Sequence, residues 1–215
     1  IDQLKTKSTL PKLKRTFMRT AQGVKLFDNV PHIHDKAFTE VGAPDYTGLN
    51  FNDYLCLLEV PNPMHRLWSD EKWNKLIVAH GCYWKKCTFC DVSLDYIKRF
   101  ETNPAKLFVD HMETLMKQNG IDGFHFVDEA APPSALRAIS EEIIRRKLSL
   151  SWGGNIRFEK SFTPDLVKVL KESGCIAVTG GLEVASNRLL KLIKKGVTVE
   201  QVAQVTRNFS DAGIL

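Results

Sequence analysis

The chain has 215 residues, of which 43% are hydrophobic, and its formal net charge at pH 7 is +5. This size and composition fit one domain with an extension better than two full domains. The sequence contains no apolar run of about eighteen residues or more and no charged-then-apolar leader, which argues against a membrane span or a secretion signal. We therefore expect a cytoplasmic protein.

The positive charge is concentrated near the first residue. Residues 1–25 contain seven lysine and arginine residues and one aspartate, a net charge of +6, which leaves the rest of the chain at −1. A nearly neutral body gives no clear indication of a nucleic-acid surface. We interpret the basic segment as a solvated end rather than as a binding arm.

The pattern of the chain changes near residue 75. Residues 1–75 mix turn signals with short apolar pieces and hold no lasting period, so we expect an irregular lead-in or linker segment. After residue 75, short apolar runs alternate with longer amphipathic stretches; the runs cover residues 76–79, 124–127, 148–152 and 176–179. Three stretches begin with helix-start signals, at Asn103 and Thr163, each followed by proline, and at Thr198.

From residue 124 the predicted strands recur about every 26 residues, the length of a strand, a helix and their turns. This repeat predicts an α/β fold with a parallel sheet that curls into a partial (β/α) barrel over residues 76–215. Residues 198–211 read as a helix that stops at Gly213, and residues 214–215 read as the start of a fifth strand. We therefore expect a barrel truncated after about four strands, as part of a longer protein.

Three of the five cysteines lie within nine residues, at Cys82, Cys87 and Cys90. Such a cluster in a reducing compartment indicates a metal or a catalytic site rather than disulfides. Three thiolates leave a metal centre without a local fourth protein ligand, which suggests chemistry at the open position. A structural zinc site with His80 or Asp91 as fourth ligand is the stronger alternative, and inert packed thiols are the weaker one. We expect the other two cysteines to be buried: Cys56 and Cys175.

Polar residues follow each later predicted strand. In α/β barrels, reactive groups lie in the loops after the carboxyl ends of the strands, so these residues and the cysteine loop are expected on one rim. Taken alone, each has an ordinary alternative, such as a helix cap or a surface ion pair. The rim candidates are Asp128, Glu129, Asn155, Arg157, Gly181 and Glu183.

The loop Cys82-x4-Cys87-x2-Cys90, with an aromatic residue just before the last cysteine, resembles that of the radical S-adenosylmethionine (SAM) superfamily. The resemblance covers residues 76–215, and four rather than the usual three residues separate Cys82 from Cys87. Within the superfamily, the chain looks like the branch that often carries an upstream cobalamin-binding domain. That likeness rests on GCYW at 81–84, CTFCD at 87–91, VDEAAPP at 127–133, WGGNIR at 152–157 and GLE at 181–183.

The resemblance implies a radical SAM enzyme with two cofactors. Cys82, Cys87 and Cys90 would hold three irons of a 4Fe-4S cluster, and the amino and carboxylate groups of SAM would chelate the fourth iron. Reductive cleavage of SAM would then give a radical that abstracts hydrogen from an unknown substrate. Cobalamin is expected only in a longer protein, because His32 and His34 do not match the cobalamin signature.

The resemblance also implies roles for rim residues. Phe89 would pack against the adenine, and Asp128 with Glu129 would occupy the turn that binds the methionine amino group. Arg157 would meet the methionine carboxylate, and Glu183 would meet the ribose or the amino group. The further cofactor-binding candidates are Asn155 and Gly181.

The implied partners are an electron donor such as flavodoxin or ferredoxin and the unknown substrate, with no membrane and no clear nucleic acid. Methylation, sulfur insertion, rearrangement and dehydrogenation all stay open as reactions. The alternative functions are a zinc-stabilised module and a non-catalytic iron-sulfur module.

Overall fold

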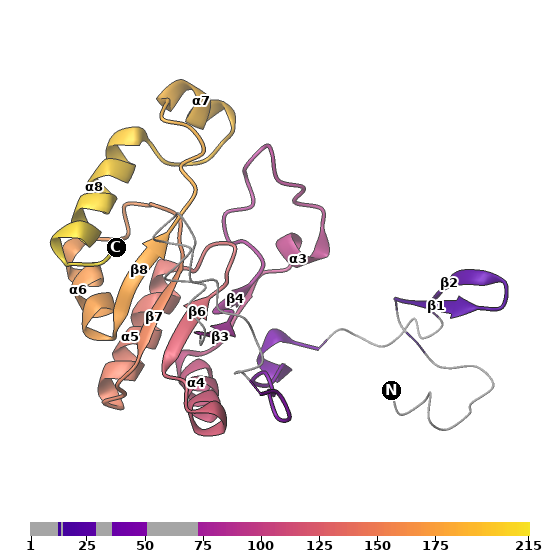
Figure 1. The fold of residues 1–215 in the computed structure, drawn as a ribbon. Coiled ribbons are helices and arrows are strands. Elements are labelled where there is room, and N and C mark those ends of the chain that lie inside the picture. Colours follow the sequence, from indigo (N-terminus) through magenta and orange to yellow (C-terminus); the bar gives the residue numbers. More distant parts are fainter. Residues whose placement is uncertain (1–12, 14, 29–35, 51–72) are drawn as a thin grey trace. The chain divides into compact units, whose positions relative to one another are not determined.

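The computed structural model describes residues 13, 15–28, 36–50 and 73–215 (Figure 1). The chain divides into two compact units, residues 1–37 and 38–215. The described part of the first unit is a β-hairpin, in which β1 (Thr16–Thr20) pairs antiparallel with β2 (Gly23–Phe27). The predicted domain boundary between residues 75 and 76 stays a prediction.

The second unit is built around a four-stranded parallel sheet in the order β3-β6-β7-β8. Its strands are β3 (Trp73–Leu76), β6 (Gly123–Phe126), β7 (Ser151–Asn155) and β8 (Cys175–Thr179). Leu76 pairs with Phe126, Phe126 with Gly154, and Gly154 with Val178. The carboxyl ends of all four strands therefore meet at one end of the sheet, and the predicted partial α/β barrel is confirmed.

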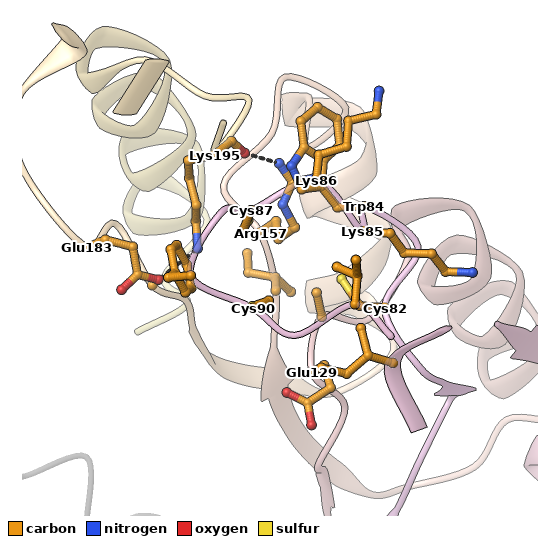
Figure 2. Close-up of a pocket in the computed structure, with 16 residues that line it drawn as sticks. Cys82, Trp84, Lys85, Lys86, Cys87, Cys90, Glu129, Arg157, Glu183 and Lys195 are labelled. Carbon is orange, nitrogen blue, oxygen red and sulfur yellow. Dashed lines mark hydrogen bonds and ion pairs between the residues drawn. The ribbon is translucent and has the colours of Figure 1, made fainter. Parts of the chain in front are cut away.

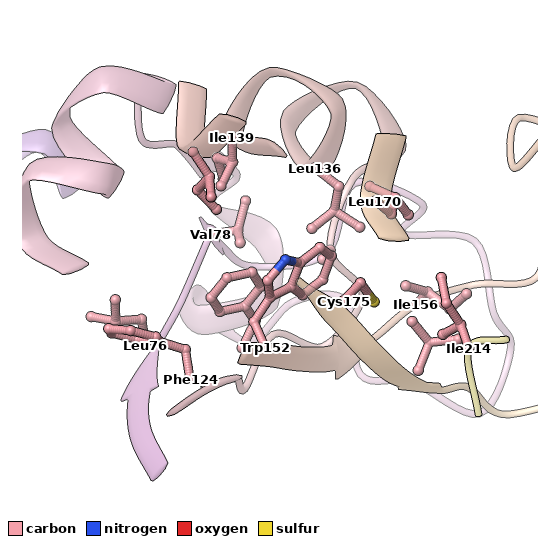
Figure 3. Packing of buried hydrophobic residues seen from close by; sticks show 14 of the residues in the cluster. Leu76, Val78, Phe124, Leu136, Ile139, Trp152, Ile156, Leu170, Cys175 and Ile214 are labelled. Atoms are coloured by element: carbon pink, nitrogen blue, oxygen red, sulfur yellow. The ribbon is translucent and has the colours of Figure 1, made fainter. Parts of the chain in front are cut away.

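Four helices cover one face of this sheet: α4 (Ala105–Asn119), α5 (Pro133–Arg145), α6 (Pro164–Glu172) and α8 (Val199–Asp211). Figure 3 shows the core between the layers. Trp152 stacks on Phe126 with ring centroids 4.9 Å apart, and Phe108 meets Phe126 edge-on at 5.1 Å. The Trp152 indole also donates to Ser173 Oγ at 3.0 Å, so this large buried ring keeps its polar atom paired.

Two strands cover other residues than predicted. The first strand was expected at residues 76–79, but it ends at Leu76, and the next residues form β4 (Ala79–His80), which pairs antiparallel with β5 (Glu101–Thr102). The third was expected at residues 148–152, but it runs to Asn155 through two glycines. A Cβ at Gly154 would lie 3.1 Å from Phe126 Cβ, so a small residue lets the strands pack closely there.

Two of the three predicted helix starts are confirmed. The Thr163 hydroxyl accepts a hydrogen bond from Leu166 N, and the Thr198 hydroxyl accepts one from Gln201 N. Asn103 is not an N-cap, because the chain enters α4 through Pro104 with no side-chain cap. Asn103 instead lies buried, and its backbone N donates to Val78 O.

The end of the chain continues the sheet. After α8, Gly213 adopts φ +69, and Leu215 lies beside β8. Val178 N donates to Leu215 O at 2.8 Å, and Leu215 N donates to Ile176 O at 3.0 Å, the pattern of a parallel neighbour. The predicted start of a fifth strand is therefore confirmed. Among the residues described, no helix is long and apolar enough to cross a membrane.

Candidate metal and cofactor site

Loops after all four sheet strands line one pocket (Figure 2). The loop between β4 and α3 (Asp95–Lys98) contributes most of its wall, including all three clustered cysteines, Cys82, Cys87 and Cys90. The other loops contribute Glu129 after β6, Arg157 after β7, and Gly181 and Glu183 after β8. The common rim expected from the order of strands is thus present in three dimensions.

Local backbone features shape the cysteine loop. Gly81 opens it with φ +80, and a Cβ at this position would overlap Arg99 O, so only glycine fits. Lys85 has φ +54, an uncommon conformation for a residue with a side chain. Lys85 lies among the four residues between the first two cysteines, and this left-handed turn accommodates the extra residue while Cys82 and Cys87 still face one pocket.

The three loop cysteines are free thiols with different exposure. Cys82 and Cys87 are partly buried, and Cys90 is exposed. Burial raises the pKa of Cys87, with Lys195 opposing the shift, and burial also raises the pKa of Cys90, with Cys82 adding to it. In the part of the chain that the structure describes, no three His, Cys, Asp or Glu side chains converge as a closed metal-ligand set. The thiols line one pocket without forming a finished centre.

Arg157 lies in the wall of this pocket and is 6% exposed. Its Nη2 donates to Lys195 O at 2.5 Å, and its guanidinium lies 4.1 Å from the Trp84 ring centroid. Nη1 is 3.5 Å from Glu159 Oε1, yet neither Nε nor Nη1 has a hydrogen-bond acceptor among the described residues. A buried guanidinium with unsatisfied N–H groups favours an anionic ligand, above all a carboxylate that can accept from both.

A second charged group in the pocket wall, the pair Lys195 and Glu183, lies beside Arg157, as Figure 2 shows. Lys195 Nζ donates to Glu183 Oε1 at 2.8 Å and lies 5.7 Å from the Phe89 ring centroid. Glu183 has φ +69, so the turn after β8 aims its carboxylate back toward Gly181. Phe89 is 54% exposed, which leaves an aromatic face at the pocket for a ligand to cover.

The acidic pair after β6 is divided between two environments. Glu129 lines the pocket, whereas Asp128 is 3% exposed and accepts hydrogen bonds from Val78 N at 2.9 Å and Ala79 N at 2.8 Å. Burial raises the pKa of Asp128 to about 6. Asn155 is likewise turned away from the pocket lining, and it donates to Asp128 O at 3.0 Å. The cofactor roles expected for these residues stay predictions, and the structure gives Asp128 and Asn155 internal partners.

Two pocket residues that contact Arg157 were missed by the sequence reasoning. Lys195 follows α7 (Asn187–Leu192), and Trp84 lies within the cysteine loop. The sequence offered a signal for Trp84, since an aromatic residue between metal-ligand candidates is unusual, but none for Lys195. Cys175 is fully buried, as expected. His125 lies outside the pocket lining, with its Nδ1 3.0 Å from Lys75 Nζ. Cys56, His32 and His34, for which the sequence also gave predictions, lie outside the described residues.

The comparisons with known proteins agree with this geometry. The family model of the radical SAM superfamily matches residues 76–215. An uncharacterized methyltransferase from Pyrococcus horikoshii is 28% identical over 165 residues, which cover 73% of this chain and 36% of that protein. The anaerobic magnesium-protoporphyrin IX monomethyl ester cyclase of Rubrivivax gelatinosus is 28% identical over 163 residues, which cover 69% of this chain and 29% of the cyclase.

A solved structure shows the same fold. The cobalamin-dependent SAM radical enzyme OxsB with aqua-cobalamin bound matches 98% of this chain and 30% of its own, with a TM-score of 0.67 and 18% sequence identity. The chain spans about a third of the length of the relatives that it matches. The fold and the site define an α/β protein with a partial parallel barrel and three clustered cysteines in the loop between β4 and α3. The chain belongs to the radical SAM superfamily.

Proposed function

We propose that this chain is the SAM-binding and cluster-binding part of a radical SAM enzyme. One observation carries the proposal: three cysteine thiols share a pocket with a buried Arg157 guanidinium, and two of its nitrogens have no hydrogen-bond acceptor in the part of the chain that the structure describes. Thiols suit iron, and the free N–H groups suit the carboxylate of an amino acid. The donor set therefore fits both a 4Fe-4S cluster and SAM.

The cysteines would hold the cluster, which when reduced supplies the electron that cleaves SAM to methionine and a 5'-deoxyadenosyl radical. Arg157 would fix the methionine carboxylate, and Trp84 and Lys195 O hold the guanidinium in place for it. Glu129 lies at the pocket wall beside the loop and would attract the methionine ammonium. Phe89 would cover the adenine, and Lys195 keeps Glu183 at the pocket edge.

The whole protein would need a one-electron reductant and a substrate. The names of the relatives include a methyltransferase and a cyclase, so the superfamily core is compatible with more than one reaction on the substrate. The OxsB structure carries cobalamin, and for the present protein we propose cobalamin only as a cofactor of a longer chain. A cytoplasmic location remains our proposal.

Anaerobic reconstitution with iron and sulfide tests the proposed function. We expect a brown protein with about four irons per chain that forms 5'-deoxyadenosine from SAM when dithionite is added. Zinc uptake without colour would support the zinc module instead, and a stable cluster that never responds to SAM would support a non-catalytic iron-sulfur module. Either result would overturn the proposal.

Arg157→Lys sharpens this test, because lysine keeps the charge and loses the two-pronged fork. We expect SAM affinity of the reconstituted protein to fall by about tenfold or more while iron content stays near normal. Calorimetric titration with SAM measures the affinity. Lys160→Met, which removes an exposed charge in the same loop outside the pocket lining, is the matched control.

A further inference from the structure

A second hollow adjoins the cysteine pocket on the outer side of the cysteine loop. It lies between this loop, α7 and the first turn of α8. Trp84 and Lys86 line both the hollow and the pocket, so these two side chains form a shared wall. We call the hollow the basic groove. Its other lining residues include Asn187, Leu190, Lys191, Lys194 and Gln201.

The basic groove carries positive charge that the rest of the site does not use. Lys86, Lys191 and Lys194 are exposed, and among the described residues no aspartate or glutamate lines the groove. A carboxylate beside the groove belongs to Glu200, whose two oxygens accept from Asn187 Nδ2 at 3.1 and 3.0 Å. Three ammonium groups around one concave surface focus a positive potential that attracts an acidic partner.

Exposed apolar surface accompanies the charge. Leu192 ends α7, immediately after Lys191, and it is 66% exposed. A protein partner can contact several separated lysines and a neighbouring apolar side chain at once, whereas a small anion would contact only one or two of the charges. The groove therefore fits an acidic protein better than a free phosphate.

Trp84 joins the basic groove to the cysteine pocket. Its indole nitrogen donates to Lys194 O at 2.9 Å, and its ring lies against Gly196, where a Cβ would overlap the ring. On the pocket side, the ring faces the Arg157 guanidinium at 4.1 Å. A partner bound in the basic groove would thus be separated from the cysteine pocket by the Trp84 ring.

We propose that the basic groove is the docking site of an acidic one-electron carrier protein, and that its electron enters the cysteine pocket past Trp84. This inference rests on the proposed function, because only a reductively driven site needs such a partner. In the transfer, the carrier loses one electron and the centre held by the three cysteines gains one. Lysine residues speed the encounter and make it depend on ionic strength, while the apolar contact gives a short-lived complex.

A double charge reversal, Lys191→Glu with Lys194→Glu, tests the docking site. The control is Lys117→Glu with Lys168→Glu, which makes the same change in net charge on exposed faces of α4 and α6. Binding of oxidised flavodoxin, an acidic carrier, is measured by biolayer interferometry at low and moderate salt, with and without reconstituted cluster. We expect the groove variant to bind about tenfold more weakly, with a smaller salt dependence, and the control variant to bind like the native chain.

The electron path is tested in the same proteins. The rate of 5'-deoxyadenosine formation with reduced flavodoxin is divided by the rate with dithionite, which needs no docking. We expect this ratio to fall about tenfold in the groove variant and to stay constant in the control. Equal flavodoxin affinity and an equal ratio in both variants would overturn the docking site. Absence of turnover with dithionite in the native chain would instead overturn the proposed function, so the two failures are distinguishable.

Discussion

Cysteines occupy two contrasting regions of this half-barrel. Cys175 is the first residue of β8, is fully buried against the helix layer, and has a pKa raised mainly by that burial. Cys87 and Cys90 lie in the loop after the first strand and line an open pocket. The same side chain is an apolar core element at the start of a strand and a ligand candidate beyond the end of one, because only there does the backbone leave the sheet and face a pocket.

Replacement of single cysteines is expected to have the largest effect, and it tests directly whether the loop cysteines and Cys175 have different roles. Cys82→Ala, Cys87→Ala or Cys90→Ala should each abolish stable cluster binding, because two thiolates cannot hold a cluster that needs three. Iron and sulfide analysis after anaerobic reconstitution measures the loss. Cys175→Ala should leave the iron content unchanged, and iron loss in that variant would show that the two regions are not independent.

The core side of the comparison is tested by Trp152→Ala. Its ring is 1% exposed and stacks on Phe126, so its removal should lower the free energy of unfolding by about 3–5 kcal/mol. Trp84→Ala, in the loop, should cost clearly less, about 2 kcal/mol or below, because the ring is only partly buried. Urea unfolding measures both values. Similar losses for the two variants would mean that the cysteine loop is as much a part of the core as β7.

Asp128 joins the end of β6 to the stretch that leads into the cysteine loop, through its hydrogen bonds from Val78 N and Ala79 N. Its titration should make the free energy of unfolding depend on pH. Its folded-state pKa of about 6 lies above the usual value of about 3.9, so the folded chain binds more protons than the unfolded chain between these values. The stabilising contribution is therefore complete below about pH 4 and is lost as the pH rises through about 6, by up to about 3 kcal/mol.

The pH effect is measured by urea unfolding of the native chain and of Asp128→Asn, which cannot titrate. We expect the native chain to lose stability relative to the variant as the pH rises from about 4 to about 6. Parallel pH profiles for the two proteins would contradict a buried, titrating Asp128.

The smallest expected effect concerns the contact between Gly196 and the Trp84 ring of the cysteine loop. Gly196 and Gly120 have similar φ angles, +78 and +71, so alanine at either should cost about 1–2 kcal/mol through backbone strain. At Gly120 no atom of the described residues lies within 4 Å of the added Cβ, whereas at Gly196 the added atom would overlap the Trp84 ring. Gly196→Ala should therefore also change the near-UV circular dichroism and lower cluster retention. Identical behaviour of the two variants would show that Trp84 does not depend on this contact.

Features that depend on local sequence patterns could be predicted from the sequence alone. The repeat of apolar runs predicted the parallel sheet, and the spacing of Cys82, Cys87 and Cys90 indicated the candidate metal site. The third strand was misplaced because Gly153 and Gly154 carry no strand propensity, and only contact with the neighbouring strand explains them.

Contacts between distant residues were beyond the sequence reasoning. Trp84 reaches Lys194 across 110 positions, and no local pattern encodes that contact. The direction of the Asp128 side chain was also hidden, because an acidic residue after a strand reads equally as a rim ligand or as an internal acceptor.

The two backbone hydrogen bonds that Asp128 accepts have a mechanical consequence. They fasten the stretch leading into the cysteine loop to the end of β6, one residue before Glu129. The start of the cysteine loop and the start of the loop that carries Glu129 are therefore held at a fixed separation. A ligand bound between the cysteine loop and Glu129 would therefore contact two loops whose bases are hydrogen-bonded to each other, which favours a preorganised site.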